Sequence, residues 1–268
     1  MVFLMSNIEK DIKREEKHIV LAFFDILGTA NRLLDGKFQE VYNFYECMIK
    51  LCSDEWVTMA IPNRLRKFRN EPAISELLGG MLSPLLVLSF PLKHAFFSDT
   101  FIMWVEYDDF TDARIGGFLE KCSSIMCEAI KRRIPLRGVV SRGMAIMDDE
   151  NQIFLGAPIA EAAKAESAQK WLGVTLAKSC AKFHSCDIAT ILPYTKHIKE
   201  SNKALLSNLV LDWPRWWREH EKQDVNSLID AMNVATGYSE YYDNTKAFVS
   251  YSSHGDEIWR LIFTQEHI

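Results

Sequence analysis

The chain has 268 residues, 48% hydrophobic and 25% charged, enough to bury a core without help from disulfides or a structural metal. The formal net charge of -5 excludes the general affinity for nucleic acid or anionic membranes that a basic surface would give. The six cysteines form no CxxC pair, and the longest apolar run (81–92) contains prolines and is shorter than the ~20 residues of a membrane helix. We therefore expect reduced thiols, no membrane span and a cytoplasmic location.

A buried strand is predicted from His18 to Ile26, because the run HIVLAFFDI is apolar over nearly its whole length. Asp25 stands near the end of this run, where an acid can face a site. Gly28 then opens a turn into a helix, and free backbone N–H groups at such a turn can hold phosphate oxygens. Apolar residues recur at helical spacing from Phe38 to Cys52, which predicts an amphipathic helix.

A β-hairpin with a polar tip is predicted next. The apolar segments 93–97 and 101–107 flank the tip Ser98-Asp99-Thr100. The preceding residues 53–84 contain prolines and the basic run RLRKFR, so we expect an irregular or partly helical segment with solvated charges. Because neighbouring strands of one sheet can bring a strand end and a hairpin tip together, the two acids are predicted to converge.

The rest of the pattern completes an α+β fold. Residues 115–130 keep a helical period, residues 136–147 predict a strand, residues 152–155 predict a short return strand, and Pro158 starts an Ala-rich helix expected to reach Trp171. The order β-α-β-β-α-β predicts a ferredoxin-like domain with helices on one face of an antiparallel sheet. We expect this domain to span residues 1–200. A helical extension is expected over 201–268, packed on the same domain or on a dimer interface.

Two converging carboxylates suit reactions in which two metal ions act on a phosphate, and cyclisation of a nucleotide is one of these. Closing a nucleoside triphosphate into a 3′,5′-cyclic monophosphate requires the ribose 3′-hydroxyl to lose its proton while pyrophosphate leaves. Two divalent cations held by shared carboxylates stabilise the charge on both groups. Asp25 and Asp99 are the candidates for this role, although either acid alone would equally suit a turn or a helix cap.

Four segments resemble the class III nucleotide cyclases. FFDILGTA resembles their signature FxDIxGFT, FFSDT stands where they have an IGD hairpin, LRGVVSRG resembles their strand RxGIxxG, and FLGAPIAEAAKAESA resembles WGxxVNxAARxxxxA. Together the segments cover about residues 18–180 in the order of the family. The resemblance implies two manganese or magnesium ions bound by Asp25, Asp99 and the backbone oxygen of Ile26, and a triphosphate contact by Arg137.

The same resemblance implies which residues surround the nucleotide. Lys164 stands at the transition-state arginine of the family, and Ala160 stands at its asparagine. Lys164 can still supply a cation, although as a point charge. Ala95 and Ile153 replace the lysine and aspartate with which purine cyclases read the base, so purine specificity is not expected. The predicted nucleotide-binding residues are Phe24, Leu27, Gly28, Thr29, Ala95, Phe97 and Ile153.

These departures resemble the bacterial pyrimidine cyclases of the Pycsar antiphage system, as do the segments PLRG (135–138) and DWP (212–214). This resemblance implies a manganese-dependent enzyme that makes cyclic UMP or cyclic CMP, with UTP favoured over CTP. The product would be read by a separate cyclic-nucleotide-gated effector. The resemblance also implies a homodimer with its sites at the interface.

Two alternatives stay open: an atypical adenylate or guanylate cyclase, and a degenerate cyclase-fold module that binds nucleotide and signals through protein contacts.

Other kinds of functional site are not supported by the residues. The seven histidines share no metal-ligand spacing, and Ser141 lies outside a GxSxG elbow, so we expect neither a zinc site nor a serine nucleophile. The run RLRKFR is expected to be an exposed helix rather than a nucleic-acid contact.

Overall fold

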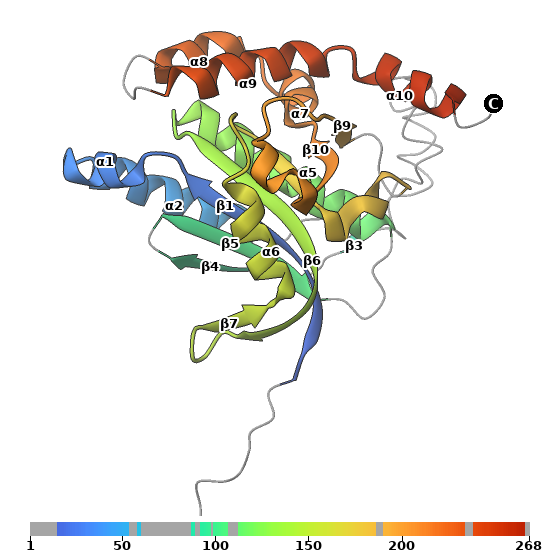
Figure 1. Cartoon of the computed structure of the whole chain (residues 1–268). Helices are drawn as coiled ribbons and strands as arrows, with labels where there is room; N and C mark the ends of the chain where they lie inside the picture. Colours follow the sequence, from blue (N-terminus) through green and yellow to red (C-terminus); the bar gives the residue numbers. More distant parts are fainter. Residues whose placement is uncertain are drawn as a thin grey trace, which may run out of the picture.

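The computed structural model describes residues 15–53, 58–59, 87–88, 92–97, 99–106, 112–185, 190–233 and 238–265. Most of the segment predicted to be irregular lies outside these residues, as does Ser98 of the predicted hairpin tip. The described part of the chain is an α+β structure built on one large, mostly antiparallel sheet, which confirms the predicted fold class (Figure 1). No helix in these ranges combines the length and the apolar character needed to cross a membrane.

The main sheet has the strand order β4-β5-β1-β6-β8-β10-β9, and β7 adds to β6. The pair β6–β8 is parallel, and the other pairs in this sheet are antiparallel. A separate pair joins β2 (Thr58–Met59) to β3 (Val87–Leu88). The strands of the main sheet are β1 Lys17–Ile26, β4 Lys93–Phe97, β5 Thr100–Glu106, β6 Leu136–Asp148, β7 Ile153–Gly156, β8 Val174–Ala177, β9 Ile191–Pro193 and β10 Leu206–Leu211.

β1 is a central strand whose side chains are buried on both faces of the sheet. Val20, Ala22 and Phe24 enter the larger hydrophobic core, whereas Ile19 and Leu21 enter a smaller core on the opposite face. This explains why the sequence of β1 is apolar without alternation. The register is what positions the site: Asp25 of β1 pairs with Thr100 of β5 on one side and with Arg137 of β6 on the other.

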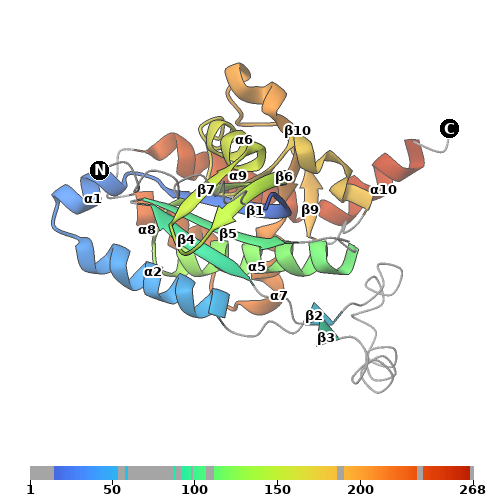
Figure 2. The same ribbon diagram turned by 90° about the horizontal axis from the view of Figure 1, so that it is seen from below.

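Most of the helices pack on the face of the larger core, and Figure 2 shows the sheet lying between α6 and the pair α2–α5. α6 is the exception, since its Ala162 and Ala165 belong to the smaller core. The prediction of helices on one face is therefore corrected for α6, whose small side chains let it pack closely on β1 and β6. The helices are α1 Thr29–Leu34, α2 Phe38–Ser53, α5 Asp112–Lys131, α6 Ala157–Glu166, α7 Trp213–His220, α8 Val225–Asn233, α9 Ser239–Ser252 and α10 Gly255–Gln265, with 3₁₀ helices η1 Lys178–Ser185 and η2 Glu200–Leu205.

α6 ends at Glu166 rather than at Trp171 as predicted. Past the helix, Gln169 forms an isolated bridge with Ile198, and its side chain donates a hydrogen bond to the Gly138 carbonyl over 2.7 Å. These contacts draw the chain back toward β6 and stop the helix. The last buried turn of α6 is thereby fixed against the sheet.

The segment 201–268, predicted to be a helical extension, contains a strand as well as helices. β10 pairs with β8 inside the main sheet, and α7 to α10 add Trp213, Ile229, Phe248 and Trp259 to the larger core. Figure 1 shows α8, α9 and α10 along one side of the molecule. The domain boundary at residue 200 stays a prediction, but the sheet continues past it.

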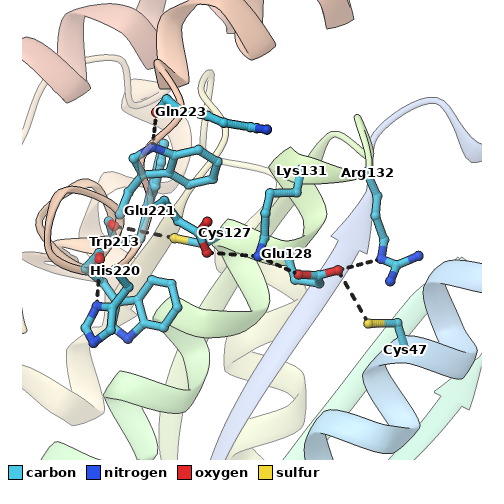
Figure 3. A network of polar contacts seen from close by, with 11 residues as sticks. Cys47, Cys127, Glu128, Lys131, Arg132, Trp213, His220, Glu221 and Gln223 are labelled. Atoms are coloured by element: carbon cyan, nitrogen blue, oxygen red, sulfur yellow. Dashed lines mark hydrogen bonds and ion pairs between the residues drawn. The ribbon is translucent and has the colours of Figure 1, made fainter.

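A network of polar contacts ties α5 to its neighbours α2 and α7 (Figure 3). Glu128 of α5 accepts hydrogen bonds from Arg132 over 2.7 Å and from the thiol of Cys47 over 3.7 Å. Lys131 bridges Glu128 and Glu221 with ion pairs of 3.1 and 2.8 Å. The described cysteines are free thiols, as expected, and burial is the main reason why the pKa of the Cys47 thiol is raised.

Candidate active site

Asp25 and Asp99 lie side by side at the end of the sheet. The backbone N–H of Ile26 donates to the carbonyl of Asp99 over 3.2 Å, and Asp25 pairs with Thr100, the next residue. The charge of Asp99 contributes to the raised pKa of Asp25. The two acids therefore share one electrostatic environment, as two ligands of a common cation site must.

Arg137 connects Asp25 to elements distant in sequence. Its Nη2 donates to Asp25 Oδ2 over 3.2 Å, and its Nε forms an ion pair with Glu166 Oε1 at the end of α6. Its Nη1 donates to the hydroxyl of Tyr241 in α9 over 3.5 Å, and the guanidinium carbon lies 5.8 Å from the centre of that ring. Each nitrogen of the guanidinium thus has a different partner.

Sequence reasoning identified Asp25 and Arg137 but missed Glu166 and Tyr241. A signal for Glu166 was present, because it lies one helical turn after Ala162 and therefore on the buried face of α6. No local signal marks Tyr241, which is 104 residues from Arg137 along the chain. Its role emerges only when α9 is packed against the sheet.

The cluster has a surplus of acid groups. Burial raises the pKa of Asp25, an effect that Arg137 opposes and Asp99 reinforces. Burial likewise raises the pKa of Glu166 to about 7, opposed by Arg137 and reinforced by the charge of Asp25. Burial, with the charges of Asp99 and Asp25, also raises the pKa of the Tyr45 hydroxyl. Carboxylates whose pKa is raised by burial and by neighbouring negative charges are stabilised in their charged form by an added cation.

The donor set fits small divalent cations. Asp25, Asp99 and the carbonyl of Ile26 offer only oxygen, the ligand that magnesium and manganese prefer. Ile26 O already accepts the hydroxyl of Thr29 over 2.8 Å, which leaves its second lone pair for another partner. The described residues hold no group of three or more His, Cys, Asp or Glu arranged to bind a metal.

The turn after β1 differs in part from its predicted anion-binding form. Gly28 opens the turn, as predicted, in a left-handed conformation with φ at +74°, but the Leu27 N–H donates to the Pro135 carbonyl over 2.8 Å and is not free for phosphate. The side chains of Leu27 and Thr29 are buried. A Cβ on Gly28 would lie 3.2 Å from the ring of Tyr238, so the aromatic residues of the α9 segment approach this turn as well.

The residues predicted to surround the base fall into two groups. The side chains of Phe24 and Ala95 are buried in the two cores, and Phe24 stacks on Phe101 at 5.9 Å between ring centres, so neither side chain faces an open surface. Phe97 and Ile153 are 41% and 46% exposed. Phe97 pairs with Thr100 and contacts Phe154, which brings β4 and the start of β7 together near Asp99.

Lys164 is not brought to the acids of its own chain. It is exposed, as is Ala160 one turn earlier, whereas Glu166 faces the sheet. Residues two positions apart on a helix point in nearly opposite directions, so Lys164 lies on the outer side of α6. In this position it is accessible to a second molecule.

No family model and no curated protein matches the sequence. The solved structures that resemble this chain include a bacterial light-regulated adenylyl cyclase, with 14% identity and a TM-score of 0.43 over 84% of this chain and 58% of that one. They also include the guanylate cyclase domain of RhGC from Catenaria anguillulae in complex with GTP (15% identity, TM-score 0.37, 68% of this chain and 91% of that one). A class III adenylyl cyclase-like ATP-binding protein from Pseudomonas aeruginosa has 13% identity and a TM-score of 0.35, over 89% of this chain and 43% of that one. This chain thus spans little more than half of the light-regulated cyclase. At such low identities and TM-scores the likeness carries no information on chemistry, which has to be inferred from the residues themselves.

Proposed function

We propose that this protein is a nucleotidyl cyclase that converts a nucleoside triphosphate into its 3′,5′-cyclic monophosphate and pyrophosphate. The observation that carries the proposal is the meeting of Asp25, Asp99 and Arg137 at one end of the sheet. Two acids beside an arginine suit a substrate that arrives with divalent cations and a polyphosphate. The sequence motifs around these residues support the same reaction.

Each residue of the cluster has a proposed role. Asp25, Asp99 and the carbonyl of Ile26 would hold two cations, which when bound would lower the pKa of the ribose 3′-hydroxyl and neutralise the triphosphate. Arg137 contacts the triphosphate, and its position against Asp25 keeps it within reach of any phosphate bound there. Lys164, exposed on the outer side of α6, would serve the site of a second copy of the chain in a homodimer.

We further propose a pyrimidine substrate, UTP in preference to CTP. The support is chemical: Ala95 is apolar and buried, and Ile153 has no polar group with which to read a base edge. The resemblance to Pycsar pyrimidine cyclases motivates the biological proposal. In it, the cyclic pyrimidine nucleotide signals phage infection to a separate effector, and manganese is the preferred ion.

A direct test offers the purified protein each of the four labelled ribonucleoside triphosphates with manganese. We expect cyclic UMP as the main product. Cyclic CMP as the main product would also agree with a pyrimidine substrate. Cyclic AMP or cyclic GMP as the dominant product would reject the pyrimidine assignment and leave an atypical purine cyclase. Absence of any cyclic product would reject the proposal that the protein is a nucleotidyl cyclase.

Two observations favour a second candidate, a nucleotide-binding signalling module without turnover. Arg137 neutralises Asp25 within the chain, and the transition-state asparagine position is held by Ala160. A module of this kind would show a triphosphate-dependent increase in melting temperature without any cyclic product. Turnover that depends on Asp25 would exclude it.

A further inference from the structure

Glu166 is a buried acid that the proposed chemistry leaves without a role. It is 7% exposed and lies at the last turn of α6, on the face that packs against β1 and β6. A buried carboxylate costs free energy unless it is paired, and here Glu166 forms an ion pair with the Nε of Arg137 and shares a side-chain hydrogen bond with Asp25. The position of Glu166 therefore depends on Arg137, and the position of Arg137 depends on Glu166.

The Glu166 side chain has fewer possible positions than the side chain of a surface acid. It is fixed by a helix whose Ala162 and Ala165 are both fully buried, so the carboxylate cannot move away from the sheet without moving α6. Glu161, on the same helix, accepts instead from the backbone N–H of Ser179 over 3.2 Å and makes no contact with Arg137. Of these two acids, Glu166 is the one built into the arginine cluster.

We propose that Glu166 is a positioning residue: it holds Arg137 by its Nε so that both Nη atoms stay directed at the place where a triphosphate binds. The inference rests on the proposed cyclase function and adds a residue that the motifs do not assign. The two Nη atoms contact Asp25 and Tyr241. These are the two contacts that phosphate oxygens would take over, since arginine offers its outer N–H groups as a fork.

Glu166 also limits a competition for Asp25. Without the Glu166 side chain, Arg137 would keep its ion pair with Asp25 and would draw closer to the oxygens that have to bind metal. With Glu166 in place, the guanidinium is shared between the two acids. Metal and arginine can then both be present, one at Asp25 and the other beside it.

The test compares Glu166→Gln with Glu161→Gln, a matched change on the same helix. We expect Glu166→Gln to raise KM for the triphosphate by about 10-fold, the size of effect seen when a supporting partner of a site residue is lost, while kcat changes less. Binding of inorganic pyrophosphate with manganese, measured by calorimetry, should weaken by a similar factor. Glu161→Gln should change neither.

A second readout does not depend on turnover. In ¹⁵N-labelled protein the Nε–H resonance of Arg137, assigned by its loss in Arg137→Lys, should shift in Glu166→Gln and stay unchanged in Glu161→Gln. An unshifted resonance together with wild-type pyrophosphate binding in Glu166→Gln would overturn the proposal. If the wild type forms no cyclic nucleotide, the cyclase assignment falls, while the resonance and pyrophosphate results still decide the role of Glu166.

Should Glu166→Gln fail to fold, Glu166→Asp takes its place, because it keeps the charge on a side chain one methylene shorter. It should raise KM for the triphosphate measurably but by less than the roughly 10-fold expected for loss of the charge, and it should shift the Arg137 Nε–H resonance from its wild-type position. A wild-type KM and an unmoved resonance in a folded Glu166→Asp would equally overturn the proposal.

Discussion

Asp25 is the residue on which the proposed function depends most. It belongs to a strand buried on both faces, yet its own side chain is 18% exposed and contacts Arg137. An acid in this place is costly, because burial opposes its charge. Asp99 adds a second negative charge nearby. A site that served only stability would have no need for two acids held against each other.

Replacing either acid by its amide should separate catalysis from folding. Asp25→Asn and Asp99→Asn should each reduce cyclase turnover by about 100-fold or more, because each removes a charge that holds a cation at the reacting phosphate. Product formation is measured by chromatography, and melting temperature checks the fold. Asp35→Asn, an exposed acid after α1, is the control and should retain wild-type turnover. Wild-type turnover in either test variant would remove that acid from the mechanism.

At this scale, the candidate residues proposed from the sequence belong to local motifs. Asp25 and Asp99 follow from a strand end and a hairpin tip, and Arg137 follows from the resemblance of its strand to a family motif. Glu166 and Tyr241 reach the cluster through packing of α6 and α9, and no local pattern contains that information. The exposed position of Lys164 likewise depends on how α6 packs.

Among the elements, the turn from β1 into α1 is constrained twice. Gly28 has φ at +74°, and its Cβ position lies 3.2 Å from the Tyr238 ring. Gly36, after α1, has nearly the same φ of +76° but nothing within 4 Å of its Cβ position. The two glycines therefore separate the cost of the backbone conformation from the cost of the contact with Tyr238.

Gly36→Ala should lower the free energy of unfolding by about 1 kcal/mol, the cost of a left-handed residue that carries a Cβ. Gly28→Ala should lower it further and should also raise KM, because the turn beside Asp25 has to move away from Tyr238. Urea denaturation and steady-state kinetics give the two values. Equal losses of stability in the two variants would show that Tyr238 does not restrict the turn.

The link between α7 and α9 is built on a buried acid. Asp212 caps α7 by accepting from the backbone N–H of Arg215 over 3.3 Å, and it accepts a short hydrogen bond from the hydroxyl of Ser252. Arg218 donates to that same hydroxyl over 3.0 Å. Asp212 is only 3% exposed, and burial is the main reason why its pKa is raised to about 6.

This raised pKa sets the sign of a pH effect. Between 3.8, the usual pKa, and about 6, the folded state binds a proton that the unfolded state lacks, so the contribution of Asp212 to stability falls as the pH rises through this window. Asp212→Asn removes the effect. Its stability relative to the wild type should therefore increase between about pH 4 and pH 7, by up to about 3 kcal/mol.

Chemical denaturation at several pH values measures this difference. Asp224→Asn is the control of opposite sign, because hydrogen bonds from Ser227 and Asn226 lower the pKa of that exposed carboxyl. Its wild-type contribution is present at neutral pH and is lost on acidification through the lowered pKa. A constant difference between Asp212→Asn and wild type across the pH range would contradict the expected titration.

Helices and strands could be predicted where a hydrophobic pattern extends over many residues. β1, α2 and α5 follow directly from runs of apolar residues, and the hairpin of β4 and β5 from its polar tip. β9 and β10 were missed because strands of three and six residues carry too little pattern, and the register of β10 shifts against β8. The face on which α6 packs was missed because a helix rich in alanine has little contrast between its sides.

For the whole molecule, the question is whether one chain contains a complete site. The acids and Arg137 gather on the inner side of α6, whereas Lys164 is exposed on its outer side. The β6–β7 arm also exposes Ile153 and Leu155, which are 46% and 60% accessible. In the proposed homodimer, Lys164 of each chain would lie at the acids of the other.

Complementation between inactive chains tests this arrangement. Asp25→Asn and Lys164→Ala should each be inactive alone, but a mixed dimer of the two contains one site in which both the acids and the lysine are intact. With random pairing, half of the dimers are mixed and each has one intact site of two, so about a quarter of wild-type activity should return. The matched control is a mixture of Asp25→Asn with Asp99→Asn, where the two acids belong to the same site and no intact site can form. Recovery in the first mixture and none in the second, after co-expression and with dimer formation checked by sedimentation, is the expected result. If neither mixture recovers while the proteins sediment as dimers, Lys164 serves the acids of its own chain or none.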